Sequence, residues 1–324
     1  MKGDHIMQEK TIQIIENMKR QTIGVEVEMN NITRQKAAHV AAELFGTNRS
    51  AYTAYVNGYQ TWSAWDADGR EWKFQKDTSI KGPDDEKCEL VTPILQYADI
   101  ETLQKLIRAL RKNGAKSCPS RGCGVHIHIG LNGTDGRNHD AKSLRNLANI
   151  MAAHETQIGR AIRIDYGRTD SYCKVISPKF LERLNKEKPD TMDKLANVWY
   201  ESNNANYGRR EHYNRSRYHM LNYHACFTKG TIEFRLFQFA EETAERKGGL
   251  HAGELKSYIQ LCLAMSEMAK NLAYASPKPQ QTENEKYAFR CWMLRLGFIG
   301  DEFKTARELL LKNMDGNAAW RMAS

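Results

Sequence analysis

The stretch "CGVHIHIG" (residues 123–130) places two histidines one residue apart in an otherwise apolar run. Because the side chains of a β-strand alternate between its two faces, His126 and His128 are expected to share one face. The apolar side chains at positions 125, 127 and 129 are expected on the other face. Two imidazoles on one face of a strand can bind a metal, bind an anion or face solvent. The residues of the other expected strands are needed to distinguish these possibilities.

Other expected strands also carry charged side chains at alternate positions, with apolar side chains between them. These strands lie at 20–30, 87–95 and 231–237, and the charged positions are Glu26, Glu28, Glu89, Glu233 and Arg235. Such alternation is typical of a sheet with one face on helices and the other open. Carboxylates are ligands of Mg²⁺, imidazole also suits Mn²⁺ and Zn²⁺, and a guanidinium binds phosphate or carboxylate. The combination favours a site for divalent ions and phosphates, against the alternatives of a solvated face and, for the E-x-R pattern, a cross-strand ion pair.

Helices are expected between and after these strands, at 33–46, 98–115, 139–166, 177–197 and 248–274. In the segment 98–115 the apolar residues recur at helical spacing, with Asp99 as N-cap and Gly114 as the stop. A further strand is expected at 69–80, and a hairpin across Lys229-Gly230 is expected to join 216–227 to 230–239. Because strands and helices do not alternate strictly, the sequence favours an α+β fold with a mainly antiparallel sheet.

Composition narrows the class of protein. The chain has 324 residues, with 48 Lys and Arg against 39 Asp and Glu, and a net charge of +9 that favours anionic partners. No apolar run is long enough to span a bilayer, and the first ten residues lack the apolar stretch of a secretory signal. The seven cysteines are an odd number without a C-x-x-C pair, which favours reduced thiols and a cytoplasmic protein.

Five short motifs, in this order along the chain, resemble the amidoligase family. They are "TIGVEVE" (22–28), "DTSI" (77–80) with "CELVTPIL" (88–95), "RGCGVHIHIG" (121–130), "RYHMLN" (217–222) and "TIEFRLF" (231–237). The resemblance covers about residues 22–270. This family is related to glutamate–cysteine ligase and glutamine synthetase, which join a carboxylate to an amine. The motifs are specific for this superfamily and not for a substrate.

The resemblance implies a glutamine-synthetase-like catalytic domain with a curved, mainly antiparallel sheet and helices on one face. It implies ATP and Mg²⁺ or Mn²⁺ as cofactors, and ATP-dependent amide formation through an acyl phosphate, with a carboxylate and an amine co-substrate as partners. We expect an N-terminal segment at 1–20, the catalytic domain at 21–275 and a helical extension of the same domain at 276–324.

The resemblance also implies roles for individual residues. The metal ligands would be Glu26, Glu28, Glu89, His126 and Glu233. The nucleotide contacts would be His126, Arg235 and Asn222, and the catalytic or substrate contacts would be Arg235, His128 and Arg217. Asp77 is a further candidate for substrate or nucleotide contact. The polar segment 199–216 is either a mobile cover for the reactive intermediate or an ordinary surface loop.

Two other functions fit parts of the sequence. A cupin-type oxygenase would use H-x-H as iron ligands, but such sites place a glutamate a few residues later, and "IGLNGTDG" (129–136) has none. A nucleic-acid-binding protein would use "GRREHYNRSRYH" (208–219), which is basic with interleaved aromatic residues. Against this second alternative, the E-x-E and E-x-R pairs would repel a polyanion unless a metal were bound. The aromatic insert 51–71 could shape a substrate pocket, a partner surface or a hairpin that packs its own aromatic rings.

Overall fold

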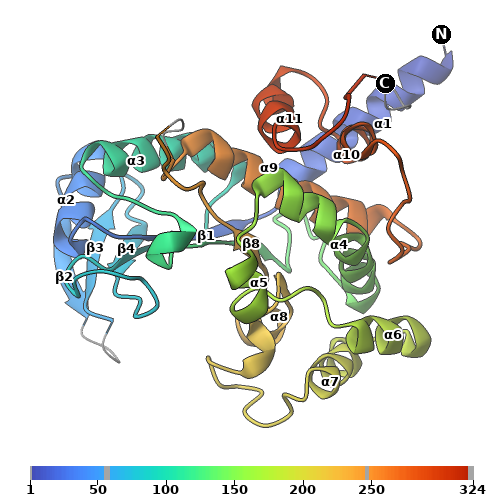
Figure 1. Ribbon diagram of the computed structural model, residues 1–324, viewed down its shortest axis with the longest axis horizontal. Helices are drawn as coiled ribbons and strands as arrows, with labels where there is room; N and C mark the ends of the chain where they lie inside the picture. Colours follow the sequence, from blue (N-terminus) through green and yellow to red (C-terminus); the bar gives the residue numbers. More distant parts are fainter. Residues whose placement is uncertain (1, 55–58, 245–247, 320–324) are drawn as a thin grey trace. The chain divides into compact units, whose positions relative to one another are not determined.

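The β-strands of the protein form one eight-stranded sheet with the order β2-β3-β4-β5-β1-β6-β8-β7. The computed structural model describes residues 2–54, 59–244 and 248–319 (Figure 1). The strands are β1 (Ile23–Met29), β2 (Ser50–Ala54), β3 (Thr61–Trp65), β4 (Glu71–Gln75), β5 (Cys88–Val91), β6 (Val125–Gly130), β7 (Leu221–Asn222) and β8 (Thr231–Phe237). The pairs β1–β5, β2–β3, β3–β4, β4–β5 and β7–β8 are antiparallel. The expected α+β class with an antiparallel sheet is confirmed.

The α-helices lie mainly before β1 and in the second half of the chain. They are α1 (Lys2–Lys19), α2 (Arg34–Leu44), α3 (Ile100–Lys112), α4 (Ala141–Ile162), α5 (Tyr166–Ser171), α6 (Pro178–Glu187), α7 (Met192–Ser202), α8 (His224–Thr228), α9 (Ala252–Asn271), α10 (Glu285–Arg295) and α11 (Lys304–Leu311). Short 3₁₀ helices are η1 (Tyr97–Asp99), η2 (Pro119–Arg121), η3 (Arg215–Arg217) and η4 (Asp301–Phe303). None of the helices in the described ranges is long and apolar enough to cross a membrane.

The chain divides into two compact units. Unit A consists of Ile23–Ile127 and Phe237–Lys256, and unit B consists of Met1–Thr22, His128–Leu236 and Ser257–Ser324. The chain passes from one unit to the other within β6, β8 and α9. The expected boundaries at residues 20 and 275 stay a prediction.

In unit A the helices cover one face of the strands. Helix α2 packs on β2, β3 and β4, and α3 packs on α2 (Figure 1). The apolar stripe predicted for α3 is fully buried; it consists of Ile100, Leu103, Leu106, Ile107 and Leu110. Burying each such side chain contributes roughly 1.5–3 kcal/mol relative to leaving it exposed. The apolar side chains Val25 and Val27 of β1 are also buried, as the alternation in that strand predicted.

The starts of α2 and α3 differ from each other. Thr33 caps α2, because its side chain accepts a hydrogen bond from Lys36 N. Asp99 occupies the N-cap position of α3 but makes no side-chain capping bond to that helix. Its carboxylate instead accepts two hydrogen bonds of 2.9 Å from the Arg70 guanidinium, and one from Gln96 N. The bidentate ion pair with Arg70 therefore replaces the predicted cap.

The aromatic insert contains the neighbouring strands β2 and β3. The rings of Tyr52 on β2 and Trp62 on β3 meet edge to face at 6.0 Å, and His39 of α2 lies 5.8 Å from the same Trp62 ring. These contacts match the alternative in which the insert packs its own aromatic side chains. Residues 55–58 of the insert lie outside the described part of the chain.

In unit B the core is built from helices and large aromatic side chains. Phe180 on α6, Trp199 on α7 and Tyr223 are almost fully buried and contact each other at ring distances of 4.9–6.1 Å. Asn146 on α4 donates to the carbonyl groups of Ala269 and Leu272, and so ties α4 to the end of α9. Burial of the rings and satisfaction of this buried amide fix the helices against each other.

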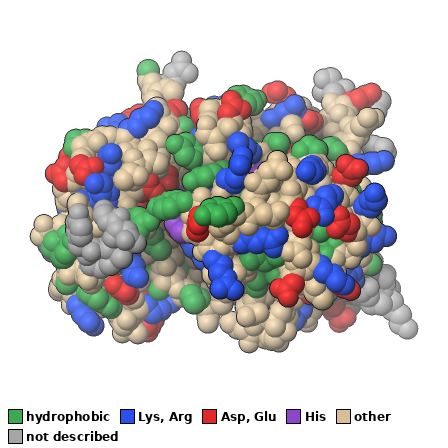
Figure 2. Space-filling model, turned by 90° about the horizontal axis from the view of Figure 1, so that it is seen from below, with side chains coloured by type: hydrophobic (Ala, Val, Ile, Leu, Met, Phe, Trp, Pro, Cys, Tyr) green, Lys and Arg blue, Asp and Glu red, His purple; other side chains and the backbone are tan. Residues whose placement is uncertain are grey.

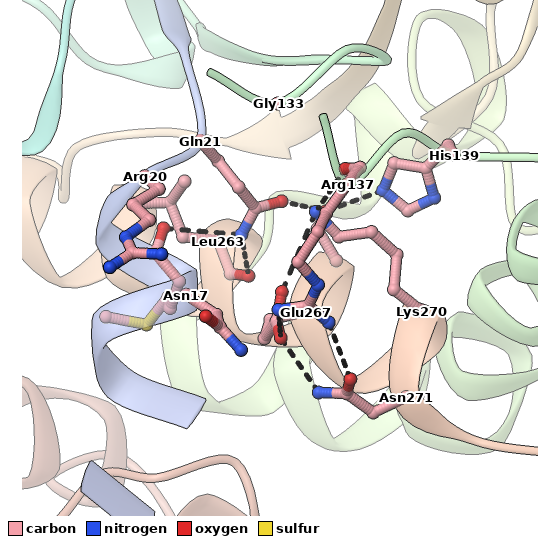
Figure 3. Close-up of polar contacts among 12 residues, drawn as sticks. Asn17, Arg20, Gln21, Gly133, Arg137, His139, Leu263, Glu267, Lys270 and Asn271 are labelled. Atoms are coloured by element: carbon pink, nitrogen blue, oxygen red, sulfur yellow. Dashed lines mark hydrogen bonds and ion pairs between the residues drawn. The ribbon is translucent and has the colours of Figure 1, made fainter. Parts of the chain in front are cut away.

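A buried polar network in unit B surrounds Glu267 of α9 (Figure 3). This carboxylate is fully buried and accepts hydrogen bonds from Arg137 Nη1 at 2.7 Å and Asn271 Nδ2 at 2.8 Å. At the preceding position, Ser266 Oγ donates to Gln21 Oε1 and lies 2.7 Å from His139 Nε2. The network therefore joins α9 to residue 21 and to the loop that follows β6.

The hairpin predicted across Lys229-Gly230 is only partly correct. β7 and β8 do pair in antiparallel fashion, with Leu221 opposite Phe234 and Asn222 opposite Glu233. The first strand, however, has only two residues, and α8 follows it directly. Asn222 Oδ1 accepts from His224 N, and this side-chain bond turns the chain into α8 instead of extending the strand.

Candidate functional site

Three glutamates of unit A lie on the face of β1 and β5 opposite to the apolar side chains. Glu26 and Glu28 are two residues apart on β1, and Glu89 of β5 is the direct antiparallel partner of Glu28. Glu28 and Glu89 are buried, with 7% and 5% exposure, and the side chain of Glu26 is 15% exposed. Like charges directly opposite each other on a sheet repel. This face is therefore a concentrated source of carboxylate oxygens.

Neighbouring groups hold these carboxylates in place. Glu28 Oε2 accepts a 2.6 Å hydrogen bond from Gly124 N, and Glu89 Oε2 accepts one of 2.7 Å from Gln75 Nε2. Gln75 of β4 is the cross-strand partner of Glu89, so the row runs across β4, β5 and β1. A regular sheet ladder thus sets the spacing of the acids.

His126 joins the acids from β6. Its Nδ1 lies 2.9 Å from Glu26 Oε2, and the side chain is almost fully buried. A histidine that contacts a carboxylate through one ring nitrogen has a fixed ring orientation, which is a common arrangement next to metal ions. One ligand atom each of Glu26, Glu89 and His126 lies within 4.8 Å of the others.

Asp77 completes a second group of the same kind in unit A. Ligand atoms of Glu28, Asp77 and Glu89 lie within 4.8 Å of one another. Asp77 Oδ1 also accepts from the backbone and hydroxyl of Ser79, which fixes its orientation in the turn after β4. Glu89 belongs to both groups, so four carboxylates and one imidazole form a continuous cluster, which we call the acidic cluster (Glu26, Glu28, Asp77, Glu89 and His126).

The electrostatics of the acidic cluster centre on Glu89. Burial raises the pKa of Glu89 well above its ordinary value, and the charges of Glu26, Glu28 and Asp77 raise it further. The hydrogen bond from Gln75 opposes this only in part. A divalent cation would remove the repulsion that raises this pKa. The donor set of carboxylate oxygens and one imidazole therefore fits Mg²⁺ or Mn²⁺.

Glycines shape the turn that leads into β6. Gly122 has φ +71°, and a Cβ atom there would lie 2.6 Å from Ser79 O. Only glycine tolerates both this left-handed backbone and the close approach. The contact places the end of η2 beside the turn that carries Asp77, just before Gly124 donates to Glu28.

In unit B, Glu233 of β8 is the centre of a second polar group. Its carboxylate, 2% exposed, pairs through Oε1 with Arg235 Nη1 and accepts through Oε2 a 2.6 Å bond from Asn222 Nδ2. His128 Nε2 lies 4.0 Å from Glu233 Oε1, and His128 Nδ1 lies 3.0 Å from Thr231 Oγ1. Glu233 and Arg235 thus form an ion pair within β8, instead of the cross-strand ion pair that is the alternative interpretation of the E-x-R pattern.

Arg217 lies close to this second group through a shared tyrosine. The guanidinium carbon of Arg217 lies 5.8 Å from the Tyr218 ring centre, and that of Arg235 lies 5.9 Å from the same centre. The structure therefore gathers Glu26, Glu28, Glu89 and His126 in unit A, and His128, Arg217, Asn222, Glu233 and Arg235 in unit B.

Several residues of these groups lack a signal in the sequence pattern. Gln75 and Gly124 contact the glutamates only because β4, β5, β1 and β6 are neighbours in the sheet. Tyr172 lies far along the chain from Tyr218, and their rings contact each other at 6.3 Å. Asp77 differs from these residues, because the sequence motif already suggests it as a candidate. Its two hydrogen bonds to Ser79 follow the common pattern of an Asp turn.

Comparison with known proteins identifies a family and a structural similarity. No curated protein matches the chain. The structure is similar to that of a bifunctional glutathione synthetase from Pasteurella multocida, with 13% sequence identity and a TM-score of 0.47. The similarity covers 95% of this chain and 48% of the other, so the chain spans about half the length of that protein. Residues 19–266, more than half of the chain, match the family described as "Putative amidoligase enzyme", and the chain therefore belongs to this amidoligase family.

Proposed function

We propose that the protein is an ATP-dependent carboxylate–amine ligase that works through an acyl phosphate and uses Mg²⁺ or Mn²⁺. The observation that carries this proposal is the acidic cluster of unit A, in which Glu89 shares two groups of ligand atoms with its neighbours. Membership of the amidoligase family supports the reaction class. The partners would be a carboxylate substrate and an amine co-substrate.

In this proposal Glu26, Glu28, Glu89 and His126 hold the cation, with Glu233 as a further ligand and Asp77 beside them. The bound cation would supply positive charge for the phosphate oxygens of ATP. The protein side chains fix the ligand oxygens before any substrate binds, because Gly124 and Gln75 orient Glu28 and Glu89. Such preorganisation lowers the cost of ordering the site during the reaction.

The group around Glu233 would serve the transfer of the phosphoryl group. An oxygen of the substrate carboxylate attacks the γ-phosphorus of ATP, and ADP leaves. The nitrogen of the amine then attacks the acyl carbon, phosphate leaves, and the nitrogen loses one proton. Arg235, held by Glu233, offers donors to the migrating phosphoryl group, His126 and Asn222 contact the nucleotide, and His128 and Arg217 contact the substrate.

Two observations weigh against a nucleic-acid-binding protein. The donor set of unit A is rich in carboxylates, whereas nucleic-acid-binding surfaces gather positive charge. On the face drawn in Figure 2, Lys and Arg side chains are interspersed with Asp and Glu side chains.

The state of the cysteines is a separate point. All seven cysteines are free thiols, which is compatible with the reduced thiols that the sequence predicts.

The test is nucleotide turnover by the purified protein. With ATP, Mg²⁺ or Mn²⁺ and pools of carboxylates and amines, we expect release of ADP and phosphate that a chelator stops. Glu26→Gln and Glu89→Gln should reduce this release by roughly 10²-fold or more, while both variants stay folded. The control is Glu101→Gln, because Glu101 is an exposed residue of α3.

Other outcomes would identify the alternatives. Wild-type protein that yields no ADP above background with any pool would contradict the ligase proposal. Binding of RNA in a gel, unchanged by a chelator, would favour the nucleic-acid-binding protein. Bound iron without any affinity for nucleotide would favour the oxygenase.

A further inference from the structure

Arg217 of unit B is a buried guanidinium that has no acidic partner among the described residues. Its side chain belongs to η3, and the residue is 8% exposed. Nη1 donates to His212 O at 3.0 Å, while Nε has no hydrogen-bond partner within the described ranges. No acidic side chain of those ranges forms an ion pair with it, in contrast to Arg235, which pairs with Glu233.

The chain around Arg217 is held rigidly. Asn214, 4% exposed, donates from Nδ2 to the carbonyl groups of Ala205, Tyr207 and Gly208. Its Oδ1 accepts from the backbone and hydroxyl of Ser216, and Trp199 Nε1 donates to the same hydroxyl. The segment that sequence patterns allowed as a mobile cover is therefore tied together around one amide, and Arg217 is preorganised.

Tyrosine rings extend from Arg217 towards solvent. The guanidinium carbon lies 5.5 Å from the Tyr213 ring centre and 5.8 Å from that of Tyr218. The Tyr172 ring meets Tyr218 edge to face at 6.3 Å. Tyr213 and Tyr172 are 63% and 52% exposed, so the rings form a partly open rim above a buried charge.

The energetics of this arrangement point to an anionic ligand. A buried charge is costly unless a counter-charge and hydrogen bonds compensate it, and contacts with aromatic faces compensate only in part. A guanidinium offers two parallel donors that match a carboxylate. We propose that the tyrosine–arginine cluster (Tyr172, Tyr213, Arg217 and Tyr218) binds an organic carboxylate whose flat or apolar body lies against the tyrosine rings.

The proposal specifies the substrate class of the proposed ligase, and its assignment of the carboxylate to a substrate rests on the proposed function. If the protein is a ligase, this carboxylate belongs to one of the two molecules that are joined, and it serves as the recognised end of that molecule. Recognition of such an anion together with a flat body would restrict the substrate to molecules with both features.

The experiment measures binding of small probes to the full-length protein by calorimetry. Benzoate combines a carboxylate with a flat ring, acetate has only the carboxylate, and benzamide has only the flat, uncharged body. We expect benzoate to bind more tightly than acetate and benzamide not to bind measurably. Arg217→Met should weaken benzoate binding about tenfold or more, since it removes a charge-assisted hydrogen bond. Arg215→Met, at an exposed position of the same short helix, should bind benzoate like the wild type.

Two further variants keep the test decisive if Arg217→Met does not fold. Tyr213→Leu and Tyr172→Leu change exposed side chains, and they should weaken benzoate while leaving acetate unchanged. Equal affinity of the wild type for acetate and benzoate would overturn the aromatic part of the proposal. Binding of benzoate that survives in folded Arg217→Met would overturn the site itself.

Competition with inorganic phosphate and ADP tests whether the cluster binds a carboxylate or the phosphate groups of a nucleotide. Phosphate or ADP that displaces benzoate and binds more tightly would assign the site to the nucleotide and overturn the carboxylate proposal. The two proposals fail separately. Benzoate binding that depends on Arg217 without any ATP turnover contradicts only the ligase, whereas turnover without benzoate binding contradicts only this cluster.

Discussion

Glu28 and Glu89 lie directly opposite each other on the antiparallel pair of β1 and β5, and both side chains are buried. Two like charges in this position destabilise a sheet, and here Glu26 and Asp77 add further negative charge. An arrangement that costs stability is expected where the same groups bind a cation. The acidic cluster is therefore better explained by ligand binding than by folding.

The first prediction concerns Glu89→Gln. Without divalent ions, this variant should be more stable than the wild type near neutral pH, since it removes the group whose ionisation burial and neighbouring charges oppose. Mn²⁺ at about one hundred times its Kd should stabilise the wild type by about 2.7 kcal/mol. Thermal unfolding with and without Mn²⁺ measures both effects. Equal stabilisation of Glu89→Gln and wild type by Mn²⁺ would rule out Glu89 as a ligand.

The second prediction concerns Glu155 of α4, outside both polar groups. Burial raises the pKa of Glu155 to about 7, although the hydrogen bond from Ile176 N partly opposes this. Below about pH 4.5 the carboxyl group is protonated in both the folded and unfolded states and costs nothing. Between about pH 4.5 and 7 only the unfolded state loses its proton, so the folded protein loses stability as the pH rises.

The matched variant is Glu155→Gln, which keeps the acceptor for Ile176 N. Its free energy of unfolding should exceed that of the wild type by an amount that grows between pH 4.5 and 7 and reaches about 3 kcal/mol at most. Urea titrations of both proteins at several pH values measure this difference. A difference that stays constant over this range would show that Glu155 ionises normally in the folded protein.

The third prediction concerns Asn214 of unit B. Asn214→Ala leaves three carbonyl groups and the Ser216 donors without this amide, and each unsatisfied buried group costs about 1–3 kcal/mol. We expect a loss of at least about 2 kcal/mol in the free energy of unfolding, with the total below the sum of the separate costs because water reaches part of the loop. The control is Asn206→Ala, an exposed residue of the same loop that contacts Arg209. If both variants unfold at the same urea concentration, Asn214 does not hold the loop.

Local sequence patterns are sufficient to predict which face of a strand carries the functional side chains, because side chains alternate between the two faces of a single strand. Glu26 and Glu28 of β1 and His126 of β6 lie on the face that the alternation predicted, and in unit A they lie close to Glu89. Patterns failed where a long-range contact decides the structure. Asp99 binds Arg70 instead of capping α3. Arg70 directly precedes β4, and its guanidinium comes close to Asp99 only in the folded protein.

The same limit explains the short strand β7. Residues 216–227 alternate well enough to suggest an extended strand, but the Asn222 side chain bonds both to Glu233 and to His224 N. The first bond needs β8 as a neighbour, and the second starts α8. Neither partner can be recognised from the pattern around Asn222 alone, so the position of the strand was predicted and its length was not.

The last prediction concerns the acid side of the stability curve and His139. Ser266 Oγ donates to Gln21 Oε1, so its oxygen accepts from His139 Nε2, and His139 Nδ1 lies 3.0 Å from Ser143 Oγ. Burial, and then the charge of Lys270, lower the pKa of His139 to about 3. Above about pH 6.5 the ring is neutral in both states. As the pH falls below 6.5, only the unfolded state gains a proton, and the folded protein loses about 1.4 kcal/mol per pH unit from this group.

His139→Asn tests this argument, because the smaller amide removes the titration along with part of the network. The variant should be less stable than the wild type at pH 7.5, and the gap should shrink as the pH falls from 6.5 to 5. His154→Asn is a comparison variant, since it alters a contact with Trp292 and leaves the Ser266 network intact; its gap to the wild type should also shrink at lower pH, because burial lowers the pKa of His154 as well. A gap for His139→Asn that stays the same at pH 7.5 and pH 5 would mean that the ring gains its proton as readily in the folded protein as in the unfolded chain, and this would contradict the lowered pKa of His139.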